Sequence, residues 1–188
     1  MTNPSTPAAD REALRFAAEL HGKLARAARV ARLNGFGYAL FGVLSSVLAL
    51  PGPDGLGLVL GAALIAVGVA QVRGAPRLAR GESSAARHLA RNELVLMVVL
   101  VLYCLFQLIP GGPGDELRDQ IGNPAGMGPE LVELADVVHR SLYTGFLCLT
   151  LLYQGGLALW FSRVRPLAER YLSEAPEWAR ETVESLRS

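Results

Sequence analysis

Four long apolar runs restrict the fold of this chain more than any other feature. They cover about residues 33–50, 56–72, 94–109 and 141–162 of a chain of 188 residues. A helix needs about 20 apolar residues to cross a bilayer, and about 17 is the practical minimum. The fourth run meets this length easily, whereas the third meets it only if its flanks reach back to the headgroups. We therefore expect an all-α, polytopic membrane protein with four transmembrane helices.

The segments between the runs support this division. The sequence PGPDG (51–55) separates the first two runs and PGGPG (110–114) ends the third, and proline and glycine are common where helices end. The polar segment 1–32 is too long for the charged start of a cleaved signal peptide. We expect a cytoplasmic N-terminal segment (1–32), a transmembrane domain (33–162) and a C-terminal tail (163–188).

The positions of the basic residues predict the orientation of the chain. Lysine and arginine are frequent before the first run, between the second and third, and after the fourth, and they are absent between the first and second. The third connection, 110–140, contains two arginines and six acidic residues. Basic connections remain on the cytoplasmic side of a membrane. We predict that both termini and the second connection are cytoplasmic and that the acidic loop 110–140 faces outward.

Small residues recur at helical spacing along three of the runs. Because lipid provides no hydrophobic drive for helices to pair, close backbone contact through small residues must hold them together. We expect these stripes to face one another in a left-handed four-helix bundle. The stripes are Gly35, Ala39, Gly42, Ser46 and Ala49; Gly57, Gly61, Leu64, Gly68 and Gln71; and Ser141, Gly145, Cys148, Leu152 and Gly155.

A few polar residues interrupt the first and fourth runs. Ser45 and Ser46 lie in the first, and Thr150, Gln154 and the adjacent Gly155 lie in the fourth. One interpretation is a hydrogen-bonded clasp between the two helices, since an unpaired amide in hydrocarbon is costly. The other is a polar step in a solute path.

The two cysteines fall at similar predicted depths. Cys148 lies on the small-residue stripe of the fourth run. Cys104 lies on a heptad stripe of the third run that we also expect to face inward, which consists of Glu93, Met97, Leu100, Cys104 and Gln107. One interpretation is a pair of neighbouring reduced thiols that a mild oxidant can bridge. The alternative is two small core residues that never meet.

The ends of the chain read as amphipathic interfacial helices. Residues 7–31 form one, and the tail from 163 forms another, with Tyr171, Leu172 and Trp178 among its expected headgroup-level anchors. Six arginines beside the runs either contact anionic lipids or serve only as topology signals: Arg77, Arg80, Arg87, Arg91, Arg163 and Arg165.

The sequence contains few residues that are placed for catalysis or metal binding. Glu133, Asp136 and His139 have a spacing that metal ligands can use, but Asp136 and Arg140 are also placed for an ordinary i, i+4 ion pair, which we favour. Glu93 lies at the edge of the third run, where it can reach water. Catalytic motifs are absent from the sequence. We expect no catalytic, cofactor or metal site and no nucleic-acid partner.

Two functions fit these observations. The first is a non-catalytic structural or accessory subunit, or a scaffold, of a membrane assembly, with a protein partner or a second copy of the chain. The second is an oligomeric pore or small-solute carrier. The scarcity of charged residues within the runs favours the first. Arg32 to Pro51 and Arg91 to Pro110 have equal spacing, which leaves open whether the two hairpins are a duplication.

Overall fold

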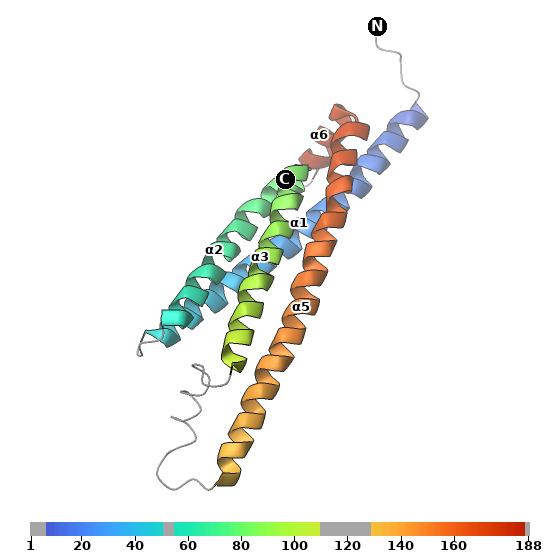
Figure 1. The fold of residues 1–188 in the computed structure, drawn as a ribbon. Coiled ribbons are helices and arrows are strands. Elements are labelled where there is room, and N and C mark those ends of the chain that lie inside the picture. Colours follow the sequence, from blue (N-terminus) through green and yellow to red (C-terminus); the bar gives the residue numbers. More distant parts are fainter. Residues whose placement is uncertain (1–6, 51–54, 110–128, 187–188) are drawn as a thin grey trace. The chain divides into compact units, whose positions relative to one another are not determined.

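The protein is described by a computed structural model over residues 7–50, 55–109 and 129–186. All regular structure in these ranges is helical (Figure 1), as expected from the sequence. The helices are α1 (Pro7–Ala49), α2 (Gly55–Ala79), α3 (Ser83–Leu108), α5 (Pro129–Glu174) and α6 (Glu177–Ser185).

Three of the described helices are long and apolar enough to cross a membrane. They are α2, α3 and the part of α5 from Asp136 to Glu174. This supports a multi-pass integral membrane protein. The apolar part of α1 follows directly after Arg32, and α1 is not among the three, so a fourth span remains a prediction.

Helices α1 and α5 are much longer than a membrane span. Helix α1 has 43 residues and is therefore about 65 Å long, about twice the thickness of the hydrocarbon layer. It continues without a break through residue 32, where we expected an interfacial helix to end. Helix α5 likewise continues past residue 162, with Pro166 inside it. The N-terminal segment and the first part of the tail thus continue α1 and α5 without a break, and α6 follows as a separate helix. The interfacial position of these ends remains a prediction.

The chain divides into two compact units. The first contains residues 1–92 and 158–188, and the second contains residues 93–157. The first unit therefore holds α1, α2, the start of α3, the end of α5, and α6.

In the first unit, α1 and α2 pack side by side (Figure 1). The N-terminal part of α1 also contacts α6 and the end of α5. We call the group formed by α1 residues 13–31, the α2–α3 turn, α5 residues 164–174 and α6 the helical cap. Its fully buried side chains include Leu24, Ala168, Tyr171 and Ala179.

The α2–α3 turn is formed by a glycine with a left-handed backbone. Gly81 has φ +83°, its N–H donates to the carbonyl of Leu78 at 3.0 Å, and the N–H of Glu82 donates to the carbonyl of Arg77 at 3.1 Å. These two bonds are those of a Schellman motif, which ends a helix by satisfying its last carbonyls. The turn thus brings α3 back beside α2, where Leu89 packs near Gly74.

The second unit contains α3 from Glu93 and α5 up to Leu157. Aromatic rings connect the two helices, since the ring centroids of Tyr103 and Tyr143 are 6.0 Å apart. Leu96, Leu100 and Cys104 form its buried side on α3.

Candidate functional site

The contact between α1 and α2 depends on glycine. A Cβ added at Gly35 would lie 2.7 Å from the carbonyl oxygen of Gly68, and one added at Gly42 would lie 2.6 Å from that of Gly61. Real Cβ atoms essentially never come this close to a backbone atom. The small-residue stripes of the first two apolar runs therefore face each other, with their backbones in direct contact.

The two serines of the first run form hydrogen bonds within this pair of helices. Ser45 Oγ donates to the carbonyl of Gly57 at 3.4 Å, and Ser46 Oγ donates to the carbonyl of Gly42 at 2.9 Å. Ser45 thus links α1 to α2. The two hydroxyls are satisfied without a residue from the fourth run.

The polar residues of the fourth run belong to the second unit. Thr150 and Gln154 are both buried, and Gly155 lies near Met97, whose Sδ would be 3.9 Å from an added Cβ. The clasp to α1 that we predicted remains a prediction. Glu93 is fully buried, so the expectation that it reaches water is wrong.

The two thiols have different environments. Cys104 is fully buried, whereas Cys148 is exposed, and both are reduced. The inward position expected for Cys148 is therefore not observed, because the stripe that it shares with Ser141 and Gly145 is exposed in this unit. A thiol pair remains a prediction.

Asp136, which we considered as a metal ligand, forms an ion pair with Arg140. Arg140 Nε lies 3.1 Å from Asp136 Oδ1 and 3.0 Å from Oδ2, which confirms the i, i+4 pair. The ring of His139 packs on Tyr143, with centroids 4.7 Å apart. Across residues 7–50, 55–109 and 129–186, no three histidine, cysteine or acidic side chains are grouped to hold a metal ion.

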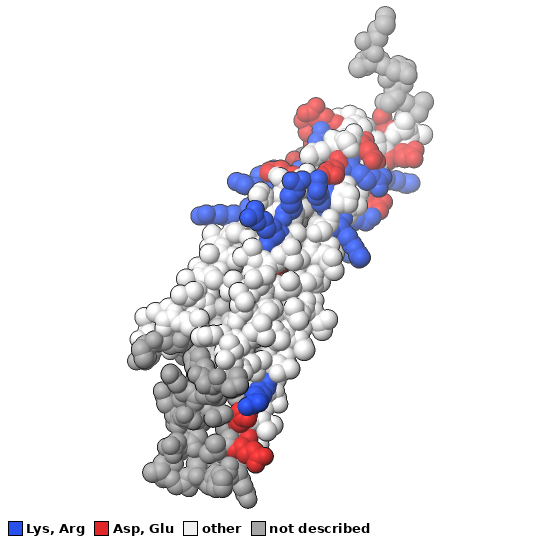
Figure 2. Space-filling model, in the orientation of Figure 1, with Lys and Arg blue, Asp and Glu red and all other residues white. Residues whose placement is uncertain are grey.

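All lysines and arginines except Arg118 and Arg140 belong to the first unit. Figure 2 shows most of the basic side chains on its visible face in one group, with acidic side chains among them. Two of the six arginines that we considered for lipid contacts are paired within the chain. Arg80 lies 3.0 Å from Glu82, and Arg165 lies 2.9 Å from Glu169. The other four form no ion pair with a described residue: Arg77, Arg87, Arg91 and Arg163.

Tyr171 is the centre of the helical cap. Its hydroxyl lies 3.5 Å from Nδ1 of His21 on α1, and its ring lies against Gly81, where an added Cβ would be 2.8 Å from Tyr171 Cδ1. Its side chain is fully buried, so our expectation of a headgroup-level anchor is wrong for this residue. The signal that sequence reasoning missed is the buried heptad-like series of Phe161, Val164, Ala168, Tyr171 and Ala175, which is typical of a helix packed on other helices.

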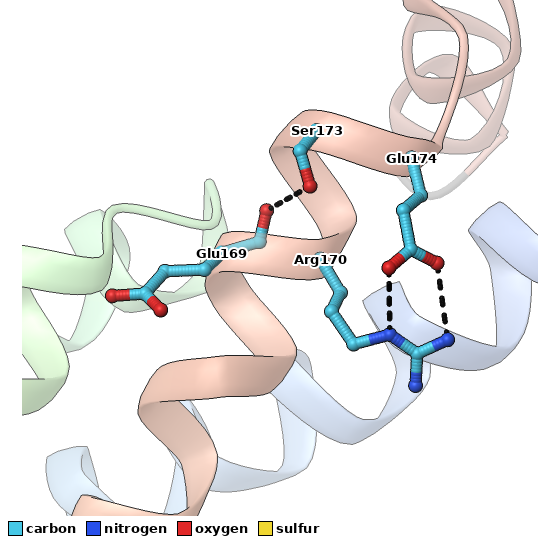
Figure 3. Close-up of polar contacts among 4 residues, drawn as sticks. All are labelled: Glu169, Arg170, Ser173 and Glu174. Atoms are coloured by element: carbon cyan, nitrogen blue, oxygen red, sulfur yellow. Dashed lines mark hydrogen bonds and ion pairs between the residues drawn. The ribbon is translucent and has the colours of Figure 1, made fainter.

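Charged side chains form pairs on the exposed sides of α5 and α1. On α5, Arg170 binds both carboxylate oxygens of Glu174, at 2.9 and 3.0 Å, and Ser173 Oγ donates to the carbonyl of Glu169 (Figure 3). The guanidinium of Arg170 also lies 5.7 Å from the ring centre of Phe16 on α1, in range of a cation–π contact.

Glu19 extends this charged contact on α1. Its carboxylate accepts a hydrogen bond from Lys23 Nζ at 2.6 Å. This bond holds the pKa of Glu19 below its ordinary value, with a smaller contribution from the charge of Arg170.

The chain was compared with protein-family models, with curated proteins and with solved structures. None of the three comparisons found a match.

Proposed function

We propose that the protein is a non-catalytic structural or accessory subunit of a membrane assembly, and that the helical cap is the part to which a protein partner or a second copy binds. The observation that carries this proposal is the buried core around Tyr171, which joins α1, the α2–α3 turn and α5. A core of this kind holds the surface around it rigidly. That surface includes the exposed side chains of Leu172, Trp178 and Leu186, which suit a partner contact.

The proposal includes four spans with both termini and the α2–α3 turn in the cytoplasm. Support for the fourth span comes from the glycine contact between α1 and α2: α2 is apolar enough to cross a membrane, and α1 follows it closely over its apolar part. Support for the orientation comes from the basic residues, which are concentrated in the N-terminal segment, the second connection and the tail. A left-handed bundle of the four spans completes the arrangement.

Lipid contacts are part of the same proposal. Arg77, Arg87, Arg91 and Arg163 carry no internal counterion among the described residues. Guanidinium groups at the edge of apolar helices attract the anionic headgroups of the cytoplasmic leaflet.

An oligomeric pore or small-solute carrier is the second candidate. Glu93, Thr150 and Gln154 are buried polar residues in helices that are apolar enough to cross a membrane. Ionisable and polar groups at such positions are typical of transport paths. These three residues, all in the second unit, would line the solute path of such a carrier.

One set of measurements separates the two candidates. The full chain and a variant that ends at Ala175, without α6, are purified in mild detergent, and their assembly states are compared by native mass spectrometry. A subunit role predicts a defined assembly that is lost without α6, with no solute flux in liposomes. The matched substitution Gln154→Leu should leave this assembly unchanged. Solute flux that Gln154→Leu abolishes, with assembly independent of α6, would favour the carrier.

A further inference from the structure

An open groove lies between α1 and α2, at the end where the α2–α3 turn begins. Its volume is about 340 Å³, near the lower end of the range of about 300–1,000 Å³ for small-molecule sites. The buried Ala28 and Ala75 form its floor, and Arg29, Arg32 and Ala79 are at its rim. The groove thus combines an apolar floor with two guanidinium groups.

The two arginines at the rim have no counterion among the described residues. Neither forms an ion pair with a described residue, and the sequence contains no acidic residue between Glu19 and Asp54 or between Asp54 and Glu82. Glu19 is bonded to Lys23 and Glu82 to Arg80. The groove itself has no acidic side chain in its described lining. Its positive charge is therefore available to an external anion.

The position of the groove along α2 corresponds to the edge of a membrane. Ala75 and Ala79 lie in the last turns of Gly55–Ala79, which is apolar enough to cross a bilayer. On α1, Arg32 precedes Gly35, which contacts Gly68 of α2, by three residues, a rise of about 4.5 Å. Both guanidinium groups are therefore near the level of lipid headgroups.

Apolar side chains continue from the groove along the same side of α1. Phe36 follows Arg32 by one helical turn and Leu40 follows by another, and both are exposed. Residues spaced by four lie on one side of a helix. A ligand at the arginines would thus have an exposed apolar surface directly beside it, which suits an acyl chain and offers nothing to a free phosphate ion.

We propose that this groove binds the phosphate headgroup of an anionic phospholipid, with Arg29 and Arg32 contacting the phosphate and Phe36 and Leu40 contacting an acyl chain. Bonds from guanidinium to phosphate oxygens are strong because both partners are charged. The choice of leaflet, the cytoplasmic one, depends on the orientation of the chain under the proposed function. Binding of the lipid does not depend on that orientation. A negative result in detergent would therefore reject the lipid site and leave the proposed subunit role untouched.

The test measures binding of phosphatidylglycerol to the full chain in mild detergent by native mass spectrometry, beside phosphatidylcholine with the same acyl chains. Each arginine near an anionic surface contributes about fivefold in binding constant. The double variant Arg29→Gln/Arg32→Gln should thus bind phosphatidylglycerol about 30-fold more weakly. Binding of phosphatidylcholine, whose choline cation offsets the charge of its phosphate, should be weaker in the unmodified protein and should change much less. The matched control is Arg11→Gln/Arg15→Gln, which removes two exposed arginines from the same helix outside the groove.

A second variant tests the groove without changing charge. Ala79→Leu extends a rim side chain into the groove and should also weaken binding of phosphatidylglycerol. Melting curves without lipid show whether each variant folds. Equal binding of the two lipids, or equal losses in the groove and control variants, would overturn the proposal. Competition by inorganic phosphate at millimolar concentration would show a free-anion site instead and would overturn the assignment to lipid.

Discussion

The substitution Gly35→Ala tests the contact between α1 and α2 most sharply, because a neighbouring glycine provides a matched control. A Cβ at Gly35 would lie 2.7 Å from the oxygen of Gly68 and 2.8 Å from Cγ2 of Val72, whereas a Cβ at Gly37 has no atom within 4 Å. To reach an ordinary contact of about 3.4 Å, the helices must separate locally by about 0.7 Å, and gaps of this size forfeit about a quarter to a half of the attraction at each contact.

The expected destabilisation by Gly35→Ala is about 1–3 kcal/mol, as for other overpacked cores. Both substitutions gain the same helix propensity, up to about 1 kcal/mol, so the difference between the two variants isolates the contact. Both tryptophans belong to the first unit, and their fluorescence during thermal unfolding in mild detergent reports on it. Gly35→Ala should melt below Gly37→Ala. Equal melting temperatures, or a higher one for Gly35→Ala, would refute the close backbone contact.

Two further predictions follow from buried and exposed side chains. Tyr171→Ala should destabilise the first unit by about 3–5 kcal/mol because it empties the centre of the cap, and Tyr171→Phe by less than about 1 kcal/mol because the hydroxyl contact to His21 is long. The same fluorescence melt checks both, and similar losses for both variants would contradict the packing role. In mild detergent, the membrane-permeant N-ethylmaleimide should modify Cys148, whose exposed side meets the detergent in the proposed fourth span, in folded protein, and Cys104 only after unfolding. Intact-mass analysis over time measures this order, and equal rates would contradict it.

The helical class and the facing glycine stripes could be predicted because both depend on local patterns. Length and hydropathy determine which helices can cross a membrane. Spacing of small residues determines which side of a helix can approach another closely, as at Gly35 and Gly68.

The helical cap could not be predicted in the same way. An amphipathic segment has an apolar side whether it lies on a membrane or packs on another helix, so Tyr171 reads equally well as an anchor or as a core residue. Its contacts with His21 and Gly81 join residues far apart in the chain. Likewise, the burial of Glu93 depends on the side chains around it, which no local pattern specifies.

The central claim is that the chain crosses the membrane four times with both termini in the cytoplasm, and labelling of single cysteines tests it most directly. In a background with Cys104→Ala and Cys148→Ala, cysteine is placed at Asp54, at Glu82 or at Glu116; Asp54 and Glu116 are outside the described residues. A membrane-impermeant maleimide is then added to intact cells. The account predicts labelling of Asp54→Cys and Glu116→Cys, and labelling of Glu82→Cys only after the membrane is opened. Labelling of Glu82→Cys in intact cells, or protection of Asp54→Cys, would contradict it.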